Sequence, residues 1–415
     1  MSSLALYPGT PKSSGASKPA PSAAFDPHHD VMLQELCSVV LASLPRSDQR
    51  RKGVQYVRGL LGAEGRKSIR NIATVVGGAA AEQSLHHFIA SSTWDWGPVR
   101  QALAQHLARI APPQAWVLRP TVIPKAGEHS VGVDRRFIPS LGQVLNAQQA
   151  IGVWAASAES SYPVNWRLHL SQAWLEDGPR RSQASIPDGV DAESLGDCAV
   201  EAFRGMTSRW GLPMRPVVVD AGDADAGRIV RRLRALPTPL LVRINGNLPL
   251  APAGAALPGR TVELRPAQQL MGAARDLRRP VVWSDHTAQG APRTSLVAGV
   301  KVRLPGPPVR PAMPVRGIRG DELLLLGVSA PGRRWPTELW LTDLVEAQPA
   351  ALLRLGRLLD RVDRDFNEVA DQVGVRDFAG RSFGGWHRHV TLASTAHAVA
   401  MLGRGAGEGG LRYAS

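Results

Sequence analysis

Cysteine is scarce in this chain. The 415 residues include two, Cys37 and Cys198, which are far apart and have no histidine at ligand spacing. This spacing argues against a zinc ribbon and a disulfide scaffold, and it is typical of proteins from a reducing cytosol. Runs of about 18 apolar residues, long enough to cross a membrane, are also missing. We therefore expect a cytoplasmic protein without membrane segments.

Acidic residues are in short supply. Lys and Arg number 49 against 35 Asp and Glu, which gives a formal net charge of +14. Such an excess favours a polyanionic partner, most often nucleic acid, since each neutralised phosphate releases counterions. A high arginine content raises the charge of many other proteins, so charge alone does not identify the partner.

The residue pattern predicts a helical region followed by an α/β region. Residues 1–29 are rich in Ser, Pro and Ala, have no apolar segment, and are expected to form a disordered tail rather than a signal peptide. Residues 30–112 have apolar residues at helical spacing. Residues 113–244 contain short β-rich runs that later alternate with helices, which indicates a sheet covered by helices.

The second half of the chain is predicted to interrupt and then complete this sheet. Residues 245–336 are rich in Pro and Gly with scattered β signals, and we interpret them as a β-rich insertion. Residues 337–403 return to the sheet with one strand, a long helix at about 349–374 and a second, apolar helix. Residues 404–415 are expected to form a flexible tail. The predicted fold class is therefore α/β.

A basic cluster lies in the helical region. It surrounds the segment "SIRNIATVVGG", which with the helix after it approximates a helix-turn-helix. An ordinary helical hairpin with a solvated basic face explains the pattern equally well. On the first interpretation, DNA is contacted by Arg50, Arg51, Lys52, Arg66, Lys67 and Arg70.

Two acidic residues stand where a metal site could form. Asp220 ends the apolar run "VVVD", which places a carboxylate at the carboxyl edge of a sheet, although capping of the next helix is an alternative role. Glu368 follows Arg364 by four residues and shares its helix face, so the two could pair. A helix-borne Glu beside a sheet-edge Asp is one way to hold Mg²⁺, whereas a solvated charged face is the commoner reason for such a pattern.

Five blocks of the sequence resemble the DDE-type transposases of bacterial insertion sequences, in the insertion-sequence four / seven-hundred-and-one group. The segment "WVLRPTVIPKAGEHSVGV" is similar to the family pattern WVVDDTGFPKKGKHSVGV. The other blocks follow in the family's order, from about residue 85 to residue 392. They are "SLGQVLNAQQA", "PVNWRLHLSQAW", "VVVDAGDAD" and "RDFNEVADQVGVRDFAGRSFGGWHRHVTLA".

The resemblance implies an RNase H-like core preceded by an all-α DNA-binding region. In such a core two Asp and one Glu hold two Mg²⁺ (or Mn²⁺) ions for DNA strand transfer. The matching positions here are Asp220 for the second Asp and Glu368 for the Glu. We add Lys125 and Arg364 to the predicted DNA contacts, and we expect a homodimer on DNA ends, associated with the nucleoid.

The first Asp of the family is missing. Where the family has Asp-Asp-Thr, this chain has Arg119-Pro120-Thr121. A guanidinium repels the two divalent ions, and a proline removes a strand N–H group. We therefore expect a DNA-binding protein of the transposase family with impaired strand transfer.

Three alternatives remain open from the sequence. Asp134 on the return strand of the same hairpin, or Glu128 in its turn, could supply a displaced carboxylate and so an active transposase. The chain could instead be a domesticated transcriptional regulator, or a relic without a binding role.

Overall fold

The N-terminal part of the protein is a group of five helices. The computed structural model describes residues 27–138, 142–222, 224–253, 263–285, 291–306, 321–330, 332–333 and 336–412, so most of the predicted tail at 1–29 lies outside the described residues. The five helices are α1 (Pro27–Val40), α2 (Ser47–Gly62), α3 (Ile69–Val76), α4 (Ala79–Ala90) and α5 (Trp96–Ile110).

One large mixed sheet forms the centre of the described chain. Its strands pair in the order β2-β3-β1-β5-β6-β12-β11-β10-β7-β8, with β4 beside β3 and β9 beside β10. Strands β1, β5 and β6 are parallel, and the other pairs are antiparallel. The first six strands are β1 (Ala115–Pro124), β2 (Asp134–Ile138), β3 (Gln143–Ala156), β4 (Ser161–His169), β5 (Val217–Asp220) and β6 (Leu240–Ile244).

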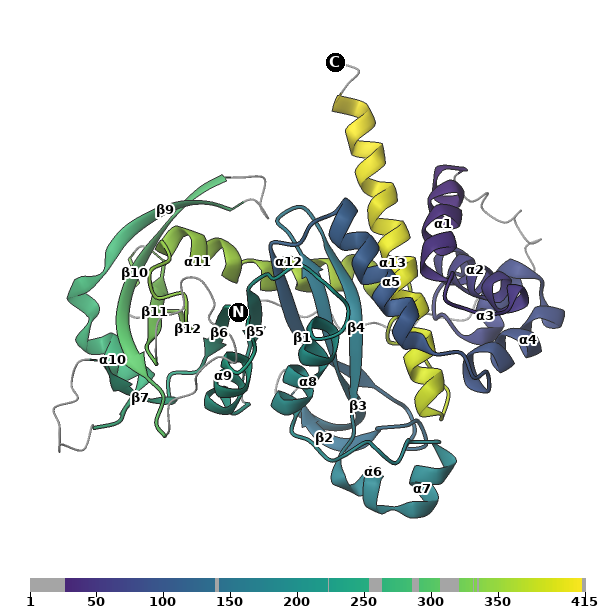
Figure 1. The fold of residues 1–415 in the computed structure, drawn as a ribbon, viewed down its shortest axis with the longest axis horizontal. Helices are drawn as coiled ribbons and strands as arrows, with labels where there is room; N and C mark the ends of the chain where they lie inside the picture. The colour runs from purple at the N-terminus through teal and green to yellow at the C-terminus, as the bar shows by residue number, and fades with distance from the viewer. Residues whose placement is uncertain are drawn as a thin grey trace, which may run out of the picture.

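The segment predicted as a β-rich insertion extends this sheet. Strand β12, which follows the insertion, pairs antiparallel with β6 and carries β11 and β10 beyond it. Figure 1 shows these strands as a curved continuation of the sheet, with β9 at its outer edge. The elements are β7 (Pro249–Pro252), β8 (Arg265–Pro266), α10 (Ala267–Ala273), a 3₁₀ turn (Arg275–Leu277), β9 (Arg279–Asp285), β10 (Ala291–Arg303), β11 (Leu323–Ser329) and β12 (Glu338–Thr342).

Helices pack on the strands of the central sheet. Helices α8 (Leu195–Thr207) and α9 (Ala226–Arg234) lie between the strands in sequence, and α8 packs on β1, β3 and β4. Helix α11 (Pro349–Gly356) packs on β9 and β6, and α12 (Leu358–Asp365) packs on β1, β3, β4 and β5. Two short helices, α6 (Gln172–Glu176) and α7 (Gly178–Gln183), follow β4.

The long helix predicted at 349–374 is broken into three parts. After α11 and α12, residues Phe366–Ala370 form a π-helical turn. The N–H of Asp371 donates to the carbonyl of Phe366 at 2.8 Å, five residues back, which is the hydrogen bond of a π-helix rather than an α-helix. The break matters because the turn contains Glu368.

The C-terminal helix is longer than the sequence pattern predicts. Helix α13 spans Phe383–Arg412, so the segment expected to be flexible from residue 404 is helical as far as Arg412. The helix continues although glycine costs about 1 kcal/mol per residue relative to alanine in a helix interior. Among the helices of the described residues, none is both long and apolar enough to cross a membrane.

The N-terminal helices share their core with α13. Figure 1 shows α13 running beside α5 and α1. Arg100 on α5 is 3% exposed and donates to Thr391 Oγ1 of α13 at 2.7 Å and to the carbonyl of Trp166 on β4 at 2.7 Å. Tyr56 Oη on α2 lies 2.8 Å from His389 Nδ1 on α13. The first and last helices therefore pack as neighbours, although they are far apart in sequence.

We predict that Arg100→Met lowers the free energy of unfolding by at least about 3 kcal/mol, because several hydrogen bonds to a buried charged group are lost together. Chemical denaturation of the full chain measures the change. Arg109→Met is the matched control, since Arg109 lies on the same helix and is exposed, and it should change stability by no more than about 0.5 kcal/mol. Equal effects of the two changes would contradict the packing role of Arg100.

Candidate functional site

Arg119, Asp220 and Arg243 lie near the carboxyl end of the parallel pairing between the neighbouring strands β1, β5 and β6. Leu118 on β1 pairs with Val219 on β5, and Asp220 pairs with Arg243 on β6. One residue beyond the last β1–β5 pair, Arg119 comes beside Asp220, with neighbouring strands about 4.8 Å apart. This is the carboxyl edge of the parallel strands, where α/β proteins place their sites.

Two cavities open on this edge. One, of about 460 Å³, is lined by Arg119, Pro120 and Asp363 among others. The other, of about 520 Å³, extends toward Gln268 and Glu338. They have in common Asp220, Gly222 and Arg243.

Asp220 is already paired within the protein. Its Oδ1 accepts from the N–H of Gly222 at 3.0 Å, and its Oδ2 accepts from the guanidinium of Arg243. This hydrogen bond raises the pKa of Arg243. The alternative of helix capping belongs to another residue, because Asp225 caps α9 by accepting from the N–H of Arg228 at 2.9 Å.

Arg119 is fixed by contacts on three sides. Its Nε donates to Asp363 Oδ1 of α12 at 2.7 Å, and a terminal nitrogen donates to Thr121 Oγ1 at 3.0 Å. Its guanidinium carbon lies 3.7 Å from the centre of the Phe366 ring. Burial lowers the pKa of Arg119, and the Asp363 carboxylate opposes this effect. Where the resemblance requires a carboxylate, the structure has an anchored cation.

Glu368 is not among the residues that line the cavities at Asp220. It is exposed in the π-helical turn. Arg364 is half-buried near the end of α12, four residues before Glu368, and the pairing of the two stays a prediction. Within the described ranges, no three His, Cys, Asp or Glu side chains gather as a metal ion would need. The donors that the described residues supply therefore do not fit a two-metal centre.

Neither displaced carboxylate lies at this edge. Asp134 on β2 pairs with Ala147 of β3, whereas Arg119 pairs with Gly152, five residues further along the same strand. At about 3.4 Å per residue this separates the two levels by ~17 Å. Glu128 is an exposed residue still further along the chain, beyond the end of β1. Neither acid lines the two cavities, although Arg136, which pairs with Asp134, also donates to Gln149, a lining residue of the first cavity.

Comparison with known proteins identifies the family. Residues 39–301 match the family model described as DDE superfamily endonuclease. The chain belongs to this family. Over 117 residues it is 26% identical to a probable transposase for insertion sequence element IS701 from Microchaete diplosiphon. That alignment covers 28% of this chain and 30% of the relative, so it spans less than a third of either protein. The family predicted from the five sequence blocks is confirmed.

In this DDE superfamily chain, most of the predicted basic cluster is accessible, with one exception. Lys67 is 7% exposed, and its backbone N–H donates to Asp377 Oδ2 at 2.7 Å while its ammonium group donates to the carbonyl of Ala63. Burial lowers the pKa of Lys67. The ammonium group is thus bonded within the fold, which gives little support to the predicted DNA contact of Lys67. Lys52 is half-buried, and the exposed members are Arg50, Arg51, Arg66 and Arg70.

Lys125 has a structural partner set. Its ammonium group donates to the carbonyl of Phe378 at 2.6 Å and to the carbonyl of Arg376 at 3.2 Å. Burial lowers its pKa to about 8, with a further contribution from nearby Arg66. These bonds tie the end of β1 to the segment before α13. The position of Lys125 in the family pattern did not reveal this role.

Two functional-site residues were missed by the sequence reasoning, Arg243 and Asp363. Arg243 is the charged residue in the otherwise apolar strand run "PLLVRI", and that irregularity was a signal. Asp363 lies among alternating charges in "RVDRD", where nothing distinguishes it from a solvated residue. Only the packing of α12 on β1 shows that it meets Arg119.

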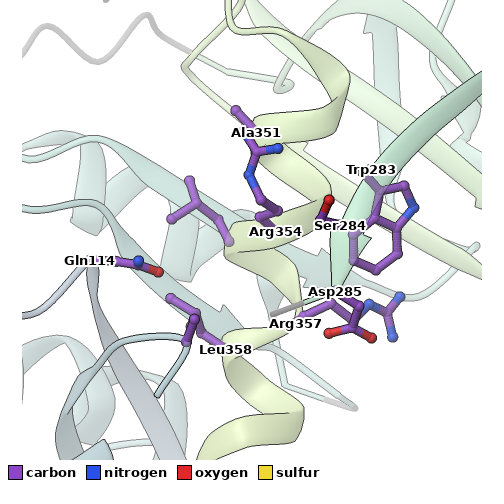
Figure 2. Close-up of a pocket in the computed structure, with 10 residues that line it drawn as sticks. Gln114, Trp283, Ser284, Asp285, Ala351, Arg354, Arg357 and Leu358 are labelled. Carbon is purple, nitrogen blue, oxygen red and sulfur yellow. The ribbon is translucent and has the colours of Figure 1, made fainter. Parts of the chain in front are cut away.

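A third cavity, of about 380 Å³, is separate from this site. Figure 2 shows it between α11, the start of α12 and strand β9, with the Trp283 indole on one side and Leu358 and Gln114 on the other. It shares no lining residue with the two cavities at Asp220. It is therefore not part of the candidate site.

We predict a measurable coupling between Arg119 and Asp363. In a double-mutant cycle of Arg119→Met and Asp363→Asn, the interaction term should be about 0.5–1 kcal/mol and should shrink as salt is added, because Asp363 is 57% exposed. Urea denaturation of the four proteins at low and high salt gives this term. A zero coupling at low salt would mean that the ion pair does not hold α12 to β1.

Proposed function

We propose that this chain is a DNA-binding member of the DDE transposase family in which strand transfer is impaired. The observation that carries the proposal is the guanidinium of Arg119. Arg119 lines the same cavity as Asp220, and its guanidinium is paired with Asp363 at 2.7 Å. A divalent cation needs carboxylate oxygens at this position and is repelled by a fixed positive charge.

The strand order supports an RNase H-like core. Strands β4, β3 and β1 form an antiparallel group, and β5 and β6 continue it parallel to β1. We assign the second Asp and the Glu of the ancestral triad to Asp220 and Glu368. Mg²⁺ or Mn²⁺ is the cofactor that this ancestry implies, and the donors present in this copy do not fit it.

The helical region supports DNA binding. Helix α3 begins at Ile69 with Ser68 accepting from the N–H of Asn71 at 3.2 Å, and two glycines of positive φ, Gly77 and Gly78, form the tight turn before α4. Exposed arginines lie before and within this hairpin. We propose that this hairpin binds DNA as a helix-turn-helix, with one helix in the major groove. We also propose that the protein binds DNA as a homodimer and acts at the nucleoid in the cytoplasm.

Two rival functions have less support. An active transposase would need Asp134 or Glu128 near Asp220, and the strand register separates them. A transcriptional regulator uses the same DNA-binding surface, so it is a biological role of the proposed function rather than a different chemistry.

We predict that the purified protein does not cut DNA carrying the flanking sequence of its own gene, with either Mg²⁺ or Mn²⁺. Product formation is followed on denaturing gels beside Asp220→Asn and Glu368→Ala variants. All three proteins should give the same background, because the natural site lacks the carboxylate set. Metal-dependent cutting by the natural protein that disappears in either variant would show a working triad and overturn the proposal.

DNA binding should depend on the exposed arginines and not on Lys67 and Lys125, whose ammonium groups are bonded to backbone carbonyls. Fluorescence anisotropy at several salt concentrations gives the slope of log affinity against log salt. Each lost phosphate contact lowers the size of this slope by about 0.9, so Arg51→Gln with Arg70→Gln should lower it by about 2. Lys125→Gln is the control and should leave the slope unchanged. Binding that ignores salt, or that weakens equally in the control, would contradict the proposed surface.

A further inference from the structure

The second carboxylate of the site has a partner of its own. Asp220 on β5 and Arg243 on β6 are cross-strand partners in parallel register, and their side chains form an ion pair. With Gly222 N–H on the other oxygen, both oxygens of the Asp220 carboxylate are in use. Arg119 takes no part in this pair, because its guanidinium is bonded to Asp363 and Thr121.

Arg243 is held in place by the sheet. Its guanidinium carbon lies 5.8 Å from the centre of the Trp340 ring on β12, and the negative charge of Glu338 adds to the effect of Asp220 in raising its pKa. Its side chain is 33% exposed, against 34% for Asp220, so the pair lies at the mouth of the two cavities rather than deep in the core. The register of β5 and β6 places Arg243 beside Asp220.

We infer that Arg243 blocks divalent-cation binding at Asp220 independently of Arg119 and Pro120. A cation that approaches Asp220 must displace a guanidinium supplied by the neighbouring strand, whatever residue stands on β1. Restoring the first Asp of the family on β1 would therefore leave Asp220 still paired with Arg243. This inference rests on the proposed function, since it explains why the metal is not bound, but it concerns a different residue on a different strand.

The test is a two-by-two comparison of Mn²⁺ binding in the full chain. The four proteins are the natural chain, Arg119→Asp with Pro120→Asp, Arg243→Gln, and the variant with all three changes. Free Mn²⁺ is measured by electron paramagnetic resonance during titration. We expect no saturable site below millimolar Mn²⁺ in the first three proteins. The triple variant should bind at least tenfold more tightly, and a further Asp220→Asn change should abolish this binding.

A matched arginine provides the control. Arg167 on β4 pairs with Glu193 at 2.6 Å and is 39% exposed, similar to Arg243. Adding Arg167→Gln to the Arg119→Asp, Pro120→Asp protein should give no gain in Mn²⁺ affinity. The inference is wrong if the Arg119→Asp, Pro120→Asp protein binds Mn²⁺ as tightly as the triple variant. It is also wrong if the triple variant binds Mn²⁺ no more tightly than the Arg243→Gln protein.

Folding and function are kept separate in this design. Circular dichroism melts check each variant, and if the paired Asp changes unfold the chain, Arg119→Asp with the natural Pro120 is compared with and without Arg243→Gln. A gain in Mn²⁺ affinity on adding Arg243→Gln then supports the inference, and no gain contradicts it. Metal-dependent DNA cutting by the natural protein would defeat the proposed function. Mn²⁺ binding after the β1 changes alone would defeat only the role of Arg243.

Discussion

The parallel register of β1, β5 and β6 fixes what the candidate site can contain. Because Val219 pairs with Leu118 and Asp220 pairs with Arg243, the residue that follows Leu118 must lie beside Asp220 at the carboxyl edge. In a DDE superfamily chain this edge is where carboxylates would gather around metal ions. Here the same register sets Asp220 on β5 between a strand that carries Arg119 and a strand that carries Arg243. The backbone arrangement fits the family, whereas the charges do not.

Charge at this edge is balanced by the protein itself. Arg119 pairs with Asp363 and Arg243 pairs with Asp220, so each guanidinium has a carboxylate partner within the fold. Metal-binding carboxylates repel one another until a cation arrives, and such an arrangement costs stability in the empty protein. Ion pairs remove that cost. Each of these two guanidinium groups therefore has its charge balanced by a carboxylate of the protein.

The helices that surround the site are tied to one another across the length of the chain. Arg100 and Tyr56 from the first helices bond to α13, and His387 on α13 stacks on Trp96 with ring centres 4.7 Å apart. Lys125 ties the end of β1 to the segment before α13. Helix α2, which carries part of the proposed DNA-binding surface, and strand β4 of the sheet both pack on α13.

The sequence by itself determined the family, the helical start, the alternating strands and helices, and the loss of the first Asp. These follow from local sequence patterns, because apolar periodicity predicts helices and strands, and matching motif residues indicate the family. It also marked Asp220 and Glu368 by position. The sequence did not predict the partners of Arg119 and Lys67, because these contacts join segments far apart in the chain. It also did not predict the π-helical turn at Glu368.

The difference is clearest at Arg119. From the sequence, an arginine in place of an aspartate predicts repulsion of a metal ion and no more. The tertiary structure brings α12 against β1 and so gives that arginine a partner, Asp363, that lies 244 residues away. It likewise sets β6 beside β5 and turns Arg243 from an irregular strand residue into the partner of Asp220. Long-range pairing decided the chemistry of this edge, because charges act on what is near them in space.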